Sequence, residues 1–197
     1  MIADRRRPAH RAAAIAVGIF LTAVTGGAAV TGLGSAMTDN PYNGTAADIA
    51  AAEGRMRQWS PLEDAEATVA SVAHQIADAA ATIVPTLRWV SAGDRTQGSC
   101  SVPFASTAGM SVFLPDMYST SPIPDAEWPA VLRAARDIAT AHGFAHIEVR
   151  ADRPGDHNVR LHSGDGNEIR LGTARAALVS GRTGCRYLRA DFGNSTE

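Results

Sequence analysis

Two histidines and one glutamate, His146, His162 and Glu168, could form a zinc site if adjacent strands bring them together. Each lies in a segment where apolar and polar residues alternate, as in a strand with one buried face. Cross-strand neighbours lie about 5 Å apart at their Cβ atoms. Imidazole and carboxylate groups are common zinc ligands, so this row is our candidate metal site.

The row depends on how three segments pair: 145–151, 159–162 and 168–171. The Gly-Asp-Gly sequence between the last two is typical of a hairpin turn. A three-residue loop there, with the apolar residues of all three segments on one buried face, sets the two histidines side by side. The same pairing puts the second histidine opposite the glutamate.

A second polar row follows from the same registers. Arg160 lies opposite Arg170, with Glu148 beside Arg160. Two opposed arginines repel each other unless the glutamate or a bound anion compensates, so Arg160 and Arg170 are candidates for anion binding. For both rows the sequence favours a simpler interpretation, a solvated sheet face whose charge pairs contribute under about 1 kcal/mol each.

No motif indicates a catalytic centre, so we assign no catalytic residue and no cofactor. The sequence lacks a Walker loop, a dinucleotide fingerprint, a Gly-x-Ser-x-Gly elbow and a His-Glu-x-x-His motif. All 18 basic residues are arginine, which excludes Schiff-base and P-loop lysine chemistry. The net charge of −2 gives no overall attraction to nucleic acid.

Two long amphipathic helices are predicted to position this sheet. Ser60 and Pro61, followed by Glu63, are typical of a capping box with proline in the first turn. Apolar residues then recur at steps of three and four until Pro85 ends the helix. A second helix is expected over about 125–142, closed by a glycine.

Shorter elements complete the prediction. We expect a short helix within 46–58, strands at 87–91 and 109–114, irregular structure at 92–108 and 115–124, Asp156-His157 in a turn, and a last hairpin joining 174–180 to 185–190. The pattern predicts an α+β fold. It is a two-layer sandwich of a mostly antiparallel sheet with two long amphipathic helices on one face.

The two cysteines, Cys100 and Cys185, bear on stability. In an exported chain an even number of cysteines indicates a disulfide. The bond would close a loop of 85 residues, and on the loop-entropy model it contributes about 4–5 kcal/mol. The alternative is a pair of free thiols, although neither cysteine lies in a cysteine-enzyme motif; we favour the disulfide.

The N-terminus has the pattern of an export leader. Residues 1–11 contain four arginines and residues 12–24 are an unbroken apolar run, shorter than the roughly 20 residues of a spanning helix. Three outcomes are open: cleavage after Ala36, retention as an anchor, or Ser35 in place of a lipid-accepting cysteine. Because a thioether needs sulfur, Ser35 cannot accept the lipid.

Several stretches together support a family resemblance. They are the arginine-rich leader, GSAMTDNPY (34–42), the helix SPLEDAEATVASVAHQIADAAATIVP leading to Trp89, and, after Cys100, AEWPAVLRAARDIATAHGF and DHNVRLHSGDGNEIRLGTARAALVSGRTGCRYL. Over about 34–190 the chain resembles the LppA-like lipoproteins of actinobacteria. The resemblance implies an envelope protein with paired Cys100 and Cys185, and no known activity. Ser35 stands where the family has its lipid-accepting cysteine.

We therefore predict a signal peptide or N-terminal membrane segment (1–36), a linker with a short helix (37–58), an α+β domain (59–192) and a tail (193–197). We expect an exported cell-envelope protein, at or outside the cytoplasmic membrane, that acts as a non-enzymatic binding module. Its partner would be an envelope component or a small ligand, not nucleic acid, and peripheral or N-terminal membrane association is open. The alternative is a metal-binding protein or hydrolase that uses the polar sheet face.

Overall fold

The computed structural model describes residues 44–192, which all belong to one compact unit of the chain. The leader, Ser35 and the predicted tail lie outside these residues. The elements are α1 (Ala46–Met56), α2 (Leu62–Ile83), β1 (Val90–Ala92), β2 (Thr96–Ser99), β3 (Met110–Phe113), β4 (Asp116–Ser119), α3 (Trp128–Ala141), β5 (His146–Arg153), β6 (Asp156–His162), β7 (Glu168–Thr173), β8 (Ala177–Arg182) and the 3-10 helix η1 (Arg189–Phe192).

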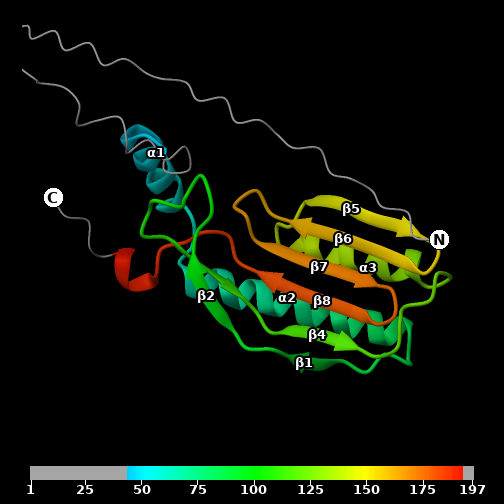
Figure 1. Ribbon diagram of the computed structural model, residues 1–197. Helices are drawn as coiled ribbons and strands as arrows, with labels where there is room; N and C mark the ends of the chain where they lie inside the picture. Colours follow the sequence, from blue (N-terminus) through cyan, green and yellow to red (C-terminus); the bar gives the residue numbers. More distant parts are fainter. Residues whose placement is uncertain (1–43, 193–197) are drawn as a thin grey trace, which may run out of the picture. The chain divides into compact units, whose positions relative to one another are not determined.

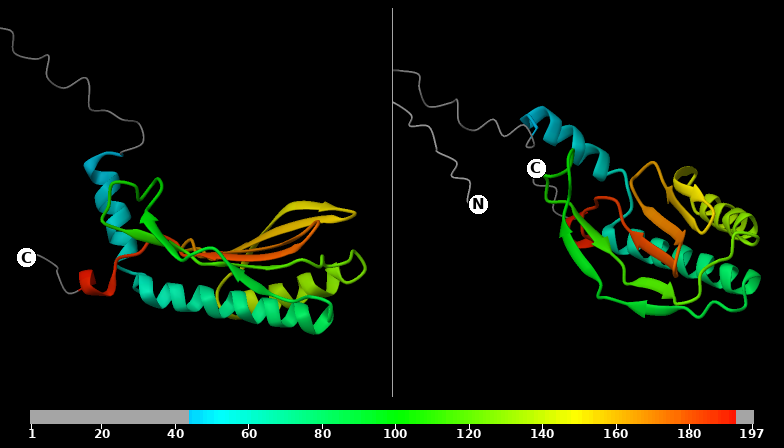
Figure 2. Two further views of the ribbon diagram at one scale, coloured as in Figure 1. Left: turned by 60° about the horizontal axis from the view of Figure 1, so that its bottom comes forward. Right: turned by 45° about the vertical axis from the view of Figure 1, so that its right-hand side comes forward.

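The eight strands form one antiparallel sheet (Figure 1). The strand order is β1-β4-β8-β7-β6-β5, while β3 pairs with β2 and with the end of β8. Helices α2 and α3 lie together on one face and leave the other face open (Figure 2). The fold is therefore α+β, with two long helices on one side of an antiparallel sheet, as the sequence predicts.

The core lies between the two helices and the sheet. Helix α2 buries a continuous apolar stripe, and α3 adds Trp128, Val131, Ala135 and Ala139. Strands β6, β7 and β8 meet them with alternate residues: Val159, Leu161, Ile169, Leu171, Ala177 and Val179. Burial of these side chains fixes which face of each strand points to solvent. Within residues 44–192, no helix is long and apolar enough to cross a bilayer.

The start of α2 differs from the predicted capping box. Pro61 is the N-cap, and no side chain caps the helix. Instead, the Leu62 amide donates to the Tyr187 carbonyl at 2.9 Å, and the Glu63 carboxylate accepts the Arg189 amide at 3.0 Å. The prediction of a capping box was wrong because the C-terminal segment forms the hydrogen bonds that a local cap would form. The Tyr187 carbonyl accepts from the first helical amide, and the Arg189 amide occupies the Glu63 carboxylate.

Three strand predictions also need correction. The stretches expected to be irregular contain β2 and β4, and Asp156-His157 begins β6 rather than lying in a turn. The last hairpin joins β7 to β8, whereas 185–190 contributes an isolated bridge between Met110 and Arg186. Long-range pairing decides these boundaries, and local composition does not reveal it.

One apolar residue on the edge strand β5 is exposed although the sequence pattern places it on the buried face. Ile147 on β5 packs partly against the core, but Val149, on the same side of the strand, is 57% exposed. Strand β5 is the last in the sheet order, and α3 contacts β6 rather than β5 closely. The expectation that the apolar residues of segment 145–151 face the core was therefore wrong at Val149.

Candidate ligand-binding face

The open face of the sheet carries cross-strand rows of side chains. Their register matches the predicted pairing: His146 with His162, His162 with Glu168, Glu148 with Arg160, and Arg160 with Arg170. Strand β8 extends both rows, because Arg182 pairs with Glu168 and Ser180 pairs with Arg170. Four strands, β5 to β8, thus contribute to one polar surface, and Phe113 of β3 lies beside Arg182.

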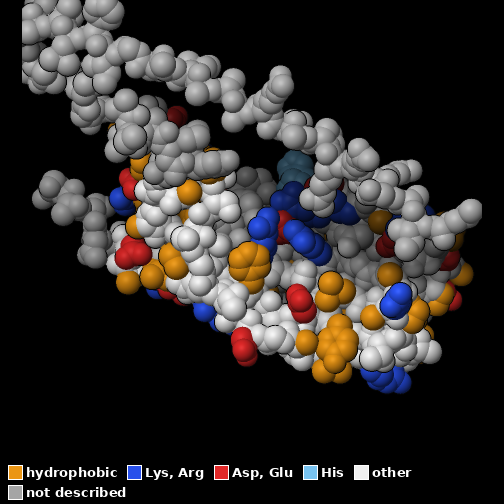
Figure 3. Space-filling model, in the orientation of Figure 1, with side chains coloured by type: hydrophobic (Ala, Val, Ile, Leu, Met, Phe, Trp, Pro, Cys, Tyr) orange, Lys and Arg blue, Asp and Glu red, His pale blue; other side chains and the backbone are white. Residues whose placement is uncertain are grey.

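Glu168 is the centre of this surface. Its side chain is only 2% exposed and accepts hydrogen bonds from three guanidinium groups. The nitrogen–oxygen distances are 2.5 Å to Arg160, 2.6 Å to Arg170 and 2.8 Å to Arg182. In Figure 3, blue arginine side chains surround a red carboxylate over the middle of the sheet. We call Arg160, Arg170, Arg182 and Glu168 the arginine cluster.

The cluster holds Glu168 in its ionised form. Burial acts to raise the pKa of this carboxyl group, but hydrogen bonds from Arg160, Arg170 and Arg182 outweigh burial and lower the pKa to about 2. Glu168 and Glu148 likewise raise the pKa of Arg160 against the effect of its burial. Glu168 and Arg160 are therefore both charged at neutral pH.

The arginines on this face outnumber the glutamates with which they form ion pairs. Glu148 lies 3.3 Å from Arg160 and 3.2 Å from Arg150, so two carboxylates serve four guanidinium groups. Arg170 uses its Nε atom on Glu168, and its terminal nitrogens have no acceptor among residues 44–192. With 52% of its side chain exposed, Arg170 presents these donors to solvent.

Two hollows adjoin the cluster and share Arg182. The first, of about 460 Å³, has Phe113, Leu114 and Leu178 as its apolar wall. Its charged members are Arg170, Arg182, Glu168 and Asp116. The second, of about 370 Å³, lies beside the disulfide, and its charged members are Arg55, Arg160, Arg182 and Asp165. Both volumes lie within the range of small-molecule sites, and both combine polar donors with apolar surface.

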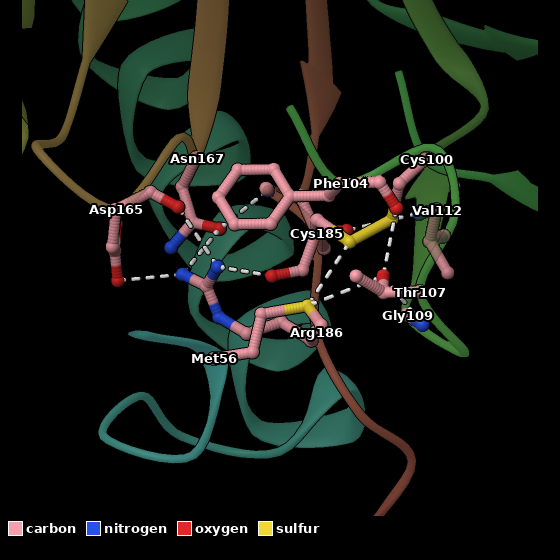
Figure 4. Close-up of a disulfide and its surroundings, with 12 residues drawn as sticks. Met56, Cys100, Phe104, Thr107, Gly109, Val112, Asp165, Asn167, Cys185 and Arg186 are labelled. Atoms are coloured by element: carbon pink, nitrogen blue, oxygen red, sulfur yellow. Dashed lines mark hydrogen bonds and ion pairs between the residues drawn. A yellow bond between two sulfur atoms is a disulfide. The ribbon is translucent and has the colours of Figure 1, made fainter. Parts of the chain in front are cut away.

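The second hollow is bordered by the disulfide and the side chains packed around it (Figure 4). Cys100 and Cys185 form the disulfide, with their Cα atoms 5.7 Å apart, and the Met56 sulfur lies 3.3 Å from Cys185 Sγ. Arg186 is fully buried and donates to the Asp165 carbonyl at 2.8 Å. Its burial lowers its pKa, and Asp165 opposes that effect. The predicted disulfide is confirmed.

The predicted zinc row has the expected backbone register but not the side-chain arrangement of a metal site. The rings of His146 and His162 stack on each other with centroids 5.0 Å apart. The Glu168 carboxylate instead turns to the arginines. Within residues 44–192, no three His, Cys, Asp or Glu side chains are grouped to hold a metal ion. We therefore propose no metal site here.

Of the anion candidates, the structure brings Arg160 and Arg170 together through Glu168. The sequence analysis missed Arg182, which completes the cluster with two hydrogen bonds to the same carboxylate oxygen, at 3.1 and 2.8 Å. The signal was the alternation of Leu178, Ser180 and Arg182 along β8. The misplaced final hairpin concealed it.

Comparison with known protein families identifies the chain. The family model described as "Lipoprotein confined to pathogenic Mycobacterium", LppA, matches residues 38–189, more than half of the sequence. The chain belongs to the LppA family. The family assignment agrees with the resemblance read from the sequence and carries no assigned activity.

A solved structure shows the same fold as this LppA-family chain. The crystal structure of LppA from Mycobacterium tuberculosis superposes with a TM-score of 0.62 at 14% identity, covering 74% of this chain and 89% of that one. A DUF4853 family protein from Actinomyces odontolyticus gives a TM-score of 0.40 at 14% identity, covering 60% and 67%. No curated protein matches the sequence.

Proposed function

We propose that this LppA-family protein is an exported cell-envelope module that binds an anionic ligand on the open face of its sheet. One observation carries the proposal: three guanidinium groups converge on one buried carboxylate and leave donors facing a hollow. Guanidinium groups match carboxylate and phosphate geometry with paired hydrogen bonds. Glu168 holds the arginines in place, so a ligand meets donors that are already ordered.

Binding suits the cluster better than catalysis. The pKa of Glu168 is about 2, and the pKa of Arg160 is raised above its ordinary value. A general acid or base needs a pKa near the working pH, and these groups cannot exchange a proton there. We therefore propose a binding module rather than a hydrolase.

The envelope location is supported by family membership and by the leader pattern of residues 1–36. With Ser35 in place of the lipid-accepting cysteine, we propose export without lipid attachment at that position. The mass of the native protein purified from the envelope tests this. An intact leader, a chain starting at Met37 and a lipid adduct each give a distinct mass.

Calorimetric titration of the full-length protein with inorganic phosphate and with citrate tests the binding proposal. Arg170→Gln should weaken binding by about tenfold, because one charge-assisted contact contributes about 1.5 kcal/mol or more. Arg136→Gln on α3, an exposed arginine on the opposite face, is the matched control and should bind like the wild type. Equal affinities for both variants, or no binding at all, would overturn the proposal.

A further inference from the structure

Exposed apolar side chains gather on the same face as the arginine cluster. Residues 44–192 contain six exposed large hydrophobic side chains. Four of them lie on β1, β3, β4 and β8 and share the face of the cluster: Val90, Phe113, Tyr118 and Leu178. Orange side chains beside the blue group in Figure 3 show this neighbourhood. Soluble proteins seldom group such side chains without a partner that covers them.

The strand register places three of these residues next to one another. Val90 pairs with Tyr118, and Tyr118 pairs with Leu178. Since directly paired residues point to the same face, they form an apolar row across β1, β4 and β8. Leu178, which is 36% exposed, is also part of the wall of the first hollow.

The fourth residue, Phe113, joins the apolar wall to the arginines. It pairs with Arg182 in the register, and the Arg182 guanidinium lies over its ring, 5.9 Å from the centroid. Such a contact orients a guanidinium while leaving its hydrogen-bond donors free for other partners. One wall of the hollow is therefore apolar, and the adjacent wall carries Arg170 and Arg182 together with the carboxylates of Glu168 and Asp116.

We propose that the ligand is an anionic amphiphile, with a phosphate or carboxylate head on an aliphatic chain. The head lies against Arg170 and Arg182, and the chain covers Phe113 and Leu178. This inference rests on the proposed function, because it names the ligand class of the same face. A small inorganic anion would leave the apolar wall in water, whereas an aliphatic chain removes that surface from water.

The hollow favours a single ligand molecule over a membrane surface. Its volume of about 460 Å³ suits a bound small molecule. The donors belong to strands β7 and β8 within a recess lined by residues of six strands, and they do not project from a loop or helix tip. A head group carried on one chain can reach these donors while the chain follows the row toward Tyr118.

Titration of the full-length protein with butyl, hexyl and octyl phosphate, kept below micelle-forming concentrations, tests this inference. Each methylene that the apolar wall buries should tighten binding by about two- to fourfold. Leu178→Thr should reduce this dependence on chain length. Val149→Thr, which alters an exposed valine on β5, should behave like the wild type.

Further ligands separate the outcomes. Octanoate in place of octyl phosphate identifies the preferred head group, and octyl glucoside, which has no charge, should bind at least tenfold more weakly. If inorganic and octyl phosphate bind equally and Arg170→Gln weakens both, the amphiphile inference fails and the anion-binding proposal stands. If none of them binds, both fail. Binding to anionic vesicles alone, without binding of monomeric octyl phosphate, would overturn the inference in favour of a membrane surface.

Discussion

His157 stacks on Trp128, with ring centroids 4.9 Å apart and an interplanar angle of 11°. The stack joins the first strand residues of β6 to the first residue of α3. Nδ1 of His157 lies 2.8 Å from Asp152, and Nε2 lies 3.0 Å from Asp125. The histidine thus connects the β5–β6 hairpin, the helix layer and the loop that precedes α3.

Replacing His157 separates the contribution of the stack from that of the hydrogen bonds. His157→Ala should lower the free energy of unfolding by about 3 kcal/mol, because a side chain only 9% exposed leaves a cavity. His157→Phe keeps an aromatic ring on Trp128 and should lose only about 1 kcal/mol. Urea denaturation of both variants gives the comparison. A phenylalanine variant as unstable as the alanine variant would show that the hydrogen bonds dominate.

The arginine cluster predicts how stability depends on acid. Because the pKa of Glu168 falls from 4.5 to about 2 on folding, its stabilisation is complete above pH 4.5. The stabilisation is lost as the pH falls from there toward 2, since the unfolded chain takes up the proton first. The difference corresponds to about 3 kcal/mol at most.

Glu168→Gln should lose a similar amount at pH 7 and show a flatter stability profile between pH 4.5 and 2. Asp137→Asn on α3, an exposed residue away from the cluster, controls for the general effect of removing one negative charge. Thermal unfolding measured at intervals across this range gives both profiles. A wild-type and a Glu168→Gln curve that remain parallel would contradict the assigned role of Glu168.

The disulfide predicts a large loss of stability on removal. Cys100 and Cys185 are separated by 85 residues. On the loop-entropy model, their bond restricts the unfolded chain and thereby raises the free energy of unfolding by about 4–5 kcal/mol. The double variant Cys100→Ser, Cys185→Ser should therefore melt roughly 10 °C lower than the wild type. A maleimide should label the native protein only after reduction, and labelling without reduction would show that the bond is absent.

The sequence predicted the central registers because strict alternation leaves little freedom. Once Leu161 and Ile169 are assigned to the buried face, Arg160 must lie opposite Arg170. The choice of partner for Glu168 could not be read in this way. Register puts His162 and Arg182 on either side of it, and the preference for guanidinium over imidazole depends on side-chain geometry and charge.

The missed elements have a different physical cause. Strand β4 has only four residues and follows Pro115, which made the segment resemble a loop. It forms because its neighbours β1 and β8 supply hydrogen-bond partners on both sides. The boundaries of β8 likewise follow from pairing with β7 and β4. Short strands of this kind depend on tertiary contacts more than on their own sequence.

The close approach of α2 to the sheet depends on Gly181 of β8. A Cβ atom at this position would lie 2.8 Å from Val69 Cγ1 of α2 and 3.1 Å from Leu114 Cδ1. Gly181→Ala should therefore force the helix or its side chains to shift and lower the free energy of unfolding by about 1–3 kcal/mol.

Gly98 on β2 provides a matched control, because a Cβ atom there would meet nothing within 4 Å. Gly98→Ala should be neutral or stabilise the protein by up to about 1 kcal/mol, since alanine restricts the unfolded chain. Chemical denaturation of the two variants should thus give shifts of opposite sign or clearly different size. An equal loss in both would show that alanine harms β2 and β8 alike through strand propensity, and that the Val69 contact does not limit the packing of α2.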